Sequence, residues 1–283
     1  MEVIMSVRIV IDSTCDLIPA IRDRVKVVPL SIHFGNEEYI DGVTINTKEF
    51  YEKLVGGDVL PTTSQPTPAA FSEVYEEAVA AGDSVIAITV ASKLSGTYHS
   101  ATIAAADFEG KVFVVDGRSV AIGTTILVQY ALKLADEGKS AEEIFEALLA
   151  IRSRVRVTAI LDTLDYLHKG GRISKTVAIA GGLLAIKPII SVDAGVLAMI
   201  SKARGNKLAN ASMNKEIDKM GGIDLSMPIV LGYTGTSDEL LQKYIAQSGD
   251  FWGGNDFPTT IVGSTVGTHA GPGAVAAAFF VQG

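Results

Sequence analysis

The sequence predicts a two-domain α/β protein, with a parallel sheet flanked by helices in the N-terminal domain and an α+β or mixed-sheet C-terminal domain. Short, continuous apolar runs such as Val7–Ile11 and Ser84–Val90 are typical of parallel strands that are buried on both faces. Segments of helical length alternate with these runs, which is the pattern of a parallel sheet. The second half contains a glycine-containing loop and a hairpin signal instead. We therefore expect domains at residues 7–155 and 156–283.

Turn and capping signals define the first elements after the initial strand. Gly35-Asn36 separates the segments Val25–Phe34 and Glu38–Ile40, which predicts a hairpin. Asn46 is followed by Glu49 three residues later. This capping-box pattern predicts a helix that runs to the two glycines at 56 and 57.

The segment Leu60–Pro68 contains three prolines, and we expect them to keep it out of regular structure. Thr67 followed by Pro68 predicts the start of a helix. Short hydroxyls and backbone N–H groups that converge near a helix start suit a small anion such as a carboxylate. Thr63 and Ser64 are therefore candidate ligands for a carboxylate. The alternative is a well-capped loop without a ligand.

The remaining elements follow from apolar runs, caps and breakers. In the first domain we expect helices at about residues 68–81 and 97–106, a strand Lys111–Asp116, and helices Val120–Glu137 and Ala141–Arg154. The last of these helices has a capping box at Ser140 and Glu143. In the second domain we expect, in order, a strand Val155–Asp162, a polar loop Tyr166–Ser174, a short helix Thr176–Leu184, a hairpin Pro188–Val192 and Val196–Ile200, a helix Leu208–Met220, a strand Pro228–Gly232, a helix Asp238–Gln247, and strands Thr259–Val262 and Ala274–Val281.

Composition excludes several classes of function. The 283 residues carry a formal net charge of −8, which argues against nucleic acid or an anionic membrane as the main ligand, with at most transient membrane contact. A single cysteine, Cys15, excludes an internal disulfide framework and fits a reducing cytoplasm. The start lacks the pattern of a signal peptide, and the longest apolar stretch, Val177–Ile186, is too short to span a bilayer. We expect a cytoplasmic protein.

Cofactor and metal motifs are not convincing in this chain. Gly271–Ala276 matches G-x-G-x-x-A, but a dinucleotide site needs a βαβ unit and a carboxylate about 20 residues later, and the sequence stops before that point. There is no Walker-type phosphate loop. The histidines are far apart and form no H-x-x-x-H pair: His33, His99, His168 and His269. We expect neither a cofactor nor a metal.

A hydrolase is one possible function. Ser95 follows a predicted strand and precedes a helix, Asp116 or Asp162 comes later, and His269 lies near the end of the chain. This is the order of the catalytic residues in α/β-hydrolases. However, Lys93 occupies the position of the first glycine in G-x-S-x-G. Without a ligand, Ser95 would serve as a helix cap and His269 would bond to the backbone of a turn.

Five motifs stand out along the chain: Asp12-Ser13-Thr14-Cys15-Asp16-Leu17, Thr63-Ser64-Gln65-Pro66, Leu94-Ser95-Gly96-Thr97, Gly170-Gly171-Arg172-Ile173 and Gly267-Thr268-His269-Ala270-Gly271-Pro272-Gly273. Together they resemble the DegV family of bacterial fatty-acid-binding proteins, in the family's order and over nearly the whole chain from about Val7.

The resemblance implies a two-domain α/β protein with a long-chain fatty acid, such as palmitate, buried between the domains. It implies that Thr63 and Ser95 hold the carboxylate. Some similar proteins deliver the fatty acid to a separate ATP-dependent fatty acid kinase, which makes acyl-phosphate for phospholipid synthesis. The resemblance assigns Arg172, His269 and Arg204 to head-group exposure and phosphoryl transfer.

The energetics of burial agree with such a ligand. A chain of about 16 carbons has roughly 14 methylenes at about 0.8 kcal/mol each, so burial contributes on the order of 11 kcal/mol before the losses of ligand freedom. The tail would supply affinity, and the contacts of the head group would supply orientation. We expect apolar stretches of the second domain to line the tail, among them Ile179, Leu183, Leu184 and Ile186.

Three hypotheses follow. The first is a non-catalytic protein that binds a long-chain fatty acid through Thr63 and Ser95 and presents it to a kinase. The second is a serine esterase or lipase that uses Ser95 and His269. The third is an adaptor that exposes Arg172 and Arg204 to dock a kinase.

Overall fold

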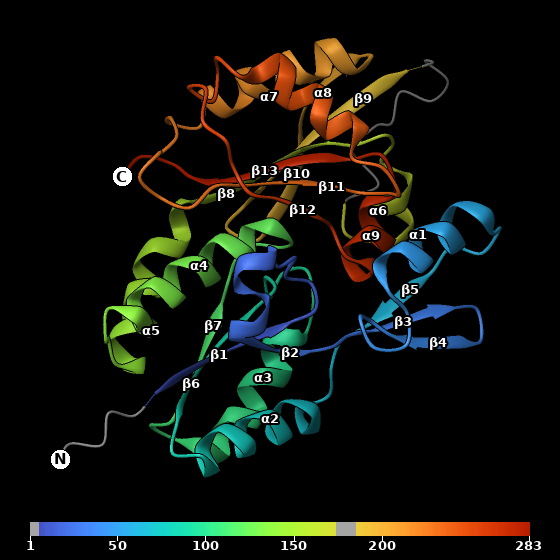
Figure 1. Cartoon of the computed structure of the whole chain (residues 1–283). Coiled ribbons are helices and arrows are strands. Elements are labelled where there is room, and N and C mark those ends of the chain that lie inside the picture. Colours follow the sequence, from blue (N-terminus) through green and yellow to red (C-terminus); the bar gives the residue numbers. More distant parts are fainter. Residues whose placement is uncertain (1–5, 174–184) are drawn as a thin grey trace.

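The computed structural model describes residues 6–173 and 185–283. Strands among these residues form a four-stranded, a six-stranded and a three-stranded sheet. Figure 1 shows the four-stranded sheet in the lower half of the molecule and the six-stranded sheet in the upper half, with α4 between them. The two large sheets thus face each other across a helical layer.

The four-stranded sheet has the strand order β2-β1-β6-β7, and every neighbouring pair is parallel. All residues of β6 are buried, as expected for a central parallel strand. The chain proceeds from β1 to β2 on one side and to β6 on the other. The carboxyl ends of β1 and β6 therefore form a switch point, where ligands bind in open α/β sheets. The strands are β1 (Val7–Asp12), β2 (Val25–Val28), β6 (Ser84–Thr89) and β7 (Val112–Asp116).

Helices cover both faces of this sheet. Val10, Val28 and Val85 pack with α2 and α3 on one face, whereas Ile11 and Ile88 pack with α4 and α5 on the other. Strand side chains alternate between the faces, so each face receives its own apolar set. The helices are α2 (Pro68–Ala80), α3 (Thr97–Ala105), α4 (Ile122–Asp136) and α5 (Ala141–Ile151), with short 3₁₀ turns at Pro19–Arg24, Ala106–Phe108 and Arg152–Arg154.

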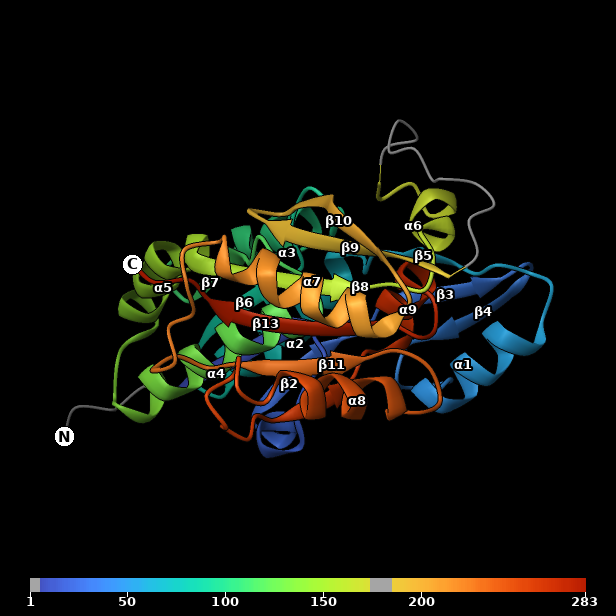
Figure 2. The ribbon, with the colours of Figure 1, turned by 90° about the horizontal axis from the view of Figure 1, so that it is seen from above.

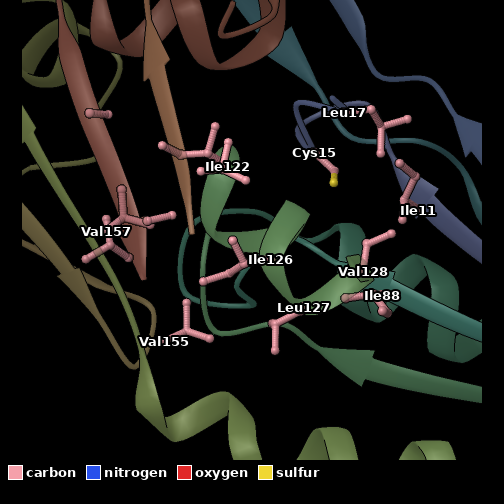
Figure 3. Packing of buried hydrophobic residues seen from close by; sticks show 14 of the residues in the cluster. Ile11, Cys15, Leu17, Ile88, Ile122, Ile126, Leu127, Val128, Val155 and Val157 are labelled. Carbon is pink, nitrogen blue, oxygen red and sulfur yellow. The ribbon is translucent and has the colours of Figure 1, made fainter. Parts of the chain in front are cut away.

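Helix α4 contacts both large sheets. Figure 3 shows Ile122 and Ile126 of this helix near Val155 and Val157 of the upper sheet, while Val128 lies toward Ile88 of the parallel sheet. Most of the helix is buried, which explains its apolar sequence. A Cβ at position 123 would come within 2.4 Å of Val157 Cγ2, so glycine allows close contact between helix and strand here.

The six-stranded sheet has the order β10-β9-β8-β13-β11-β12. Its neighbours are antiparallel except β11 and β12, which are parallel, so the sheet is mixed. One face packs on α4, and the other packs on α7 and α8, which cover it in Figure 2. The elements are β8 (Val155–Ile160), β9 (Ile186–Asp193), β10 (Val196–Arg204), α7 (Asn206–Asp218), β11 (Val230–Tyr233), α8 (Glu239–Ser248), β12 (Thr259–Ile261) and β13 (Val275–Phe280).

The three-stranded sheet, in the order β4-β3-β5, lies beside the other two with α1, α6 and α9 around it. Ile32, Phe34 and Phe50 form its small core together with Tyr51. The elements are β3 (Ser31–Phe34), β4 (Glu37–Ile40), α1 (Thr47–Gly56), β5 (Thr62–Ser64), α6 (Asp165–Lys169) and α9 (Ser264–Ala270).

The structure confirms the predicted α/β class and the local signals. The hairpin turns at Gly35-Asn36, and Asn46 and Ser140 both form complete capping boxes. Thr67 Oγ1 accepts from the Ala70 N–H and Pro68 begins the helix. The chain changes from one large sheet to the other between β7 and β8. The boundary at 155 stays a prediction, since α4 packs on both sheets.

Three local predictions were wrong. The segment 25–34 is divided at Pro29, so that β2 joins the parallel sheet and β3 the small one. Thr62–Ser64 is a strand because it pairs with β3, although the segment is rich in proline. The predicted loop from Tyr166 contains α6. Helix α9 extends into the glycine-rich motif near the end, where no element was predicted. The predicted helix Thr176–Leu184 lies outside the described residues.

Among residues 6–173 and 185–283, no helix is long and apolar enough to cross a bilayer.

Candidate functional site

A cavity lies between the two large sheets, next to the carboxyl ends of β1 and β6. It holds about 880 Å³ of empty space, counted out to its mouth. Its wall is mostly apolar, with side chains from every neighbouring element, among them Val90, Leu94, Val120, Val157, Ala159, Leu161, Ile190, Val192, Leu197, Val266 and Ala270.

Two threonines in the wall have their hydroxyls engaged elsewhere. Thr14 Oγ1 lies 2.5 Å from Asp12 Oδ1, and Thr265 Oγ1 lies 2.6 Å from Asp41 Oδ2. Both carboxylates are buried. Since these hydroxyls already donate to carboxylates, the threonines offer the cavity little beyond their methyl groups. The wall is therefore more apolar than its residue types suggest.

Polar side chains gather at one part of the cavity wall: Thr63, Ser95, Arg172 and His269. Thr63 Oγ1 and His269 Nε2 are 3.0 Å apart. Ser95 Oγ lies 2.8 Å from Thr97 Oγ1 and accepts from the Thr97 N–H at 3.3 Å. The hydroxyl of Thr63 and the imidazole of His269, which are 206 residues apart in the sequence, thus meet at the cavity.

Local structure explains how the two hydroxyls reach this place. Thr63 is the middle residue of β5 and pairs with Ile32 of β3, so its side chain points away from those of Thr62 and Ser64. Ser95 ends the turn after β6, where its N–H donates to Ala91 O.

Helix α9 carries His269, and two buried carboxylates bind its first turn. Asp16 Oδ1 accepts from the Gly263 N–H at 2.6 Å, and Asp41 Oδ2 accepts from the Thr265 N–H at 3.2 Å. N–H groups at a helix start have no partner within the helix, so carboxylates are favourable ligands there. The contacts join α9 to the N-terminal part of the chain.

The imidazole of His269 is tightly enclosed. A Cβ at Gly170 would lie 2.2 Å from His269 Nδ1, so only glycine leaves room for the ring. Nδ1 is buried and has no hydrogen-bond partner among the described residues. Burial, and then the positive charge of Arg172, lower the pKa of His269 to about 4. The ring is therefore neutral at pH 7.

Arg172 brings a positive charge to the polar part of the cavity. Its Nε donates to Leu94 O at 3.3 Å, and its second guanidinium contact is to Gly170 O at 2.6 Å. Burial lowers the pKa of Arg172, yet an arginine stays charged at neutral pH. Among the described residues Arg172 has no acidic partner. Since His269 is neutral, Arg172 is the one charged side chain among the described residues of the cavity wall. This charge can balance a carboxylate.

A second depression, the outer hollow, lies on the other side of these residues. It holds about 520 Å³ and is lined by Leu60, Pro61, Thr62, Thr63, Tyr166, Lys169, Gly170, Arg172, Thr268 and His269. Thr63, Arg172 and His269 border both spaces. The cavity and the outer hollow thus share these three side chains.

The arrangement does not assemble the hydrolase triad. His269 faces Thr63 rather than Ser95. The Asp116 carboxylate accepts from Ser92, and Asp162 pairs with Lys187. Within the described parts of the chain, no group of three or more His, Cys, Asp or Glu side chains could hold a metal ion.

Comparisons with known proteins show the family of this chain. The family model for DegV matches residues 6–282. The chain belongs to the DegV family. A DegV domain-containing protein of Caldanaerobacter subterraneus is 39% identical over 259 residues, which cover 90% of this chain and 91% of that protein.

Solved DegV structures have the same fold. A DegV family protein from Thermus thermophilus, whose structure is described under fatty acid binding, is 31% identical with a TM-score of 0.86. The match covers 98% of this chain and 100% of that protein. DegV of Bacillus subtilis, described as a fatty acid binding protein, is 28% identical with a TM-score of 0.83 and the same coverage. The Fatty Acid Kinase (Fak) B3 protein of Streptococcus pneumoniae, at 24% identity and a TM-score of 0.86, supports the fold alone.

Four of the predicted site residues of this DegV chain line one cavity: Thr63, Ser95, Arg172 and His269. The structure does not bring the other two there. Ser64 lies on the opposite face of β5 and its Oγ is 3.0 Å from His33 Nε2. Arg204 is exposed at the end of β10 and lines neither the cavity nor the outer hollow.

The predicted lining of the tail was incomplete. Ile179, Leu183 and Leu184 lie outside the described residues, and Ile186 is not among the described residues of the wall. The side chains that sequence reasoning missed come from several elements and include Val157 of β8 and Ile190 of β9. Their signal is the period of two along these strands, but the pattern alone does not tell which face borders a cavity.

The low pKa of His269 predicts a pH-dependent stability. The unfolded chain takes up this proton near pH 6.5 and the folded chain near pH 4, so the unfolded state binds more protons between these values. The free energy of unfolding should fall as the pH falls from 6.5 toward 4, by up to about 1.4 kcal/mol per pH unit from this group. Urea denaturation at several pH values measures it.

The His269→Gln variant should have a shallower slope in this window, because it has no imidazole to titrate. The matched control is His99→Gln, since His99 is exposed on α3. Equal slopes for the two variants would contradict the neutral, buried state of His269.

Proposed function

We propose that this protein binds a long-chain fatty acid, with the tail in the cavity and the carboxylate at Thr63 and Ser95. One observation carries the proposal: an apolar cavity whose polar part combines two hydroxyls with an arginine that has no acidic partner among the described residues. A long apolar ligand with one anionic end matches this distribution of polarity. The proposal gains support from the Thermus thermophilus and Bacillus subtilis relatives, both described as binding fatty acids.

The tail and the head group contribute differently to binding. Burial of roughly 14 methylenes contributes on the order of 11 kcal/mol, from which the loss of ligand freedom must be subtracted. An isolated carboxylate would be costly to bury, so the head group needs partners. The hydroxyls of Thr63 and Ser95 can donate to it, and the charge of Arg172 lowers the cost further.

We also propose that the head group is presented to a separate fatty acid kinase through the outer hollow. The shared lining of Thr63, Arg172 and His269 supports this proposal, because a partner seated at the outer hollow would contact the same side chains that border the carboxylate. Lys169, exposed at the rim, adds a second cation for a phosphorylated group. The protein itself would then be non-catalytic.

The protein should retain a lipid when it is purified. We expect organic extraction of the denatured recombinant protein, followed by mass spectrometry, to release close to one free fatty acid per chain. Delipidated protein should bind an added fatty acid of equal length. If delipidated protein binds no long-chain acid, the proposed function is wrong.

Removal of both hydroxyls should weaken binding of the acid. We expect the Thr63→Val/Ser95→Ala variant to bind hexadecanoic acid at least about tenfold more weakly, since hydrogen bonds to a charged group contribute about 1.5–3 kcal/mol each. Titration calorimetry measures the affinity and thermal unfolding confirms the fold. The matched control is Thr62→Val/Ser64→Ala on the opposite face of β5, which should bind normally. Equal affinities in both variants would remove the head-group assignment.

The kinase proposal predicts that Arg172 is needed for the transfer step. With the cognate kinase and ATP, Arg172→Ala loaded with fatty acid should form acyl-phosphate far more slowly than the wild type. Lys215→Ala, on α7, is the control for loss of one cation. An unchanged rate for Arg172→Ala would exclude this role.

A further inference from the structure

The two hydroxyls proposed to hold the carboxylate belong to separate parts of the fold. Thr63 lies in the small three-stranded sheet, and Ser95 lies at the carboxyl edge of the parallel sheet. Hydrogen bonds to a carboxylate depend steeply on distance and angle. The spacing of these two segments must therefore be held constant for both hydroxyls to reach one head group.

Gln65 connects the two segments directly. Its Nε2 donates to Ser100 Oγ at 3.0 Å, on the first turns of α3. Its amide also lies against Gly96, where a Cβ would come within 2.0 Å of Gln65 Oε1 and 2.7 Å of Cδ. The side chain thus occupies the place that any residue larger than glycine would fill beside Ser95. The contacts of Gln65 with Gly96 and Ser100 are referred to below as the Gln65 bridge.

The position of Gln65 in the chain fits this connection. It stands two residues after Thr63, and alternate residues of an extended segment point to the same side. The buried Pro66 follows and fixes the backbone. Ser100 is itself buried, and its N–H donates to Gly96 O at 3.1 Å, so both ends of the bridge are attached to ordered backbone.

We propose that Gln65 is a positioning residue that sets the spacing between Thr63 and Ser95 and thereby makes the site selective for a carboxylate head group. The proposal rests on the proposed fatty-acid function. The apolar tail gains its affinity from burial, which tolerates small shifts, whereas head-group hydrogen bonds do not. Loss of the bridge should therefore reduce the preference for an acid over an alcohol with the same tail.

Two different substitutions break the bridge. Gln65→Ala removes the side chain. Gly96→Ala introduces a methyl group at the place of the amide and displaces it. Gly96 has φ −74°, which alanine adopts readily, and the displaced atoms are the end of a flexible side chain. Neither substitution needs to disturb the core, so both variants should fold.

The experiment compares hexadecanoic acid with 1-hexadecanol. Affinities are measured by displacement of a fluorescent long-chain probe from the delipidated wild type, Gln65→Ala, Gly96→Ala and the double variant. We expect each single variant to lose about tenfold in the ratio of acid to alcohol affinity, as for one hydrogen bond to a charged group. The double variant should lose no more than either single one, because both break the same contact.

Matched controls are Gln242→Ala, an exposed glutamine of α8, and Gly56→Ala, where a Cβ meets nothing within 4 Å. Both should keep the wild-type ratio. The inference is overturned if Gln65→Ala and Gly96→Ala keep the ratio, if their losses multiply, or if acid and alcohol affinities fall together. A wild type that binds no acid would instead overturn the proposed function, and the inference with it.

Discussion

Buried carboxylates join distant segments of this protein around its cavity. Asp12 accepts from the Val90 N–H at the end of β6, and Asp16 accepts from the Gly263 N–H at the start of α9. Burial raises the pKa of both groups, and that of Asp16 well above its usual range. Carboxylates in such a place are costly unless N–H groups bind them. The position of α9, and with it that of His269, depends on these contacts.

The same contacts shape the polarity of the cavity. The hydroxyls of Thr14 and Thr265 are held by Asp12 and Asp41, so that part of the wall is effectively apolar. The chain carries a net charge of −8, yet the described cavity wall contains a lone charged side chain, Arg172. A partly buried cation costs less when an anion lies beside it. The carboxylate of the proposed ligand would balance this charge.

The sequence allowed the fold class and the local caps to be predicted, because signals such as Asn46 with Glu49 act within one turn. Strand β5 could not be predicted, since its pairing with β3 outweighs the local effect of proline. The motifs indicated Thr63 and His269 separately. Their contact, across 206 residues of sequence, follows only from tertiary structure. For Val157 the alternation was visible, but the side of β8 that borders the cavity depends on where α4 packs.

The order of strands has a consequence for biosynthesis. Strand β13 follows every other strand of the six-stranded sheet in the chain, yet it lies between β8 and β11. Until the ribosome has released β13, strands β8 and β11 each have an unpaired edge. The part of the cavity wall that Ala274 and Ala276 form is also missing until then. The parallel sheet can form during translation, whereas the mixed sheet must wait. Nascent chains are thus most open to misassociation in the interval before β13 inserts between its partners.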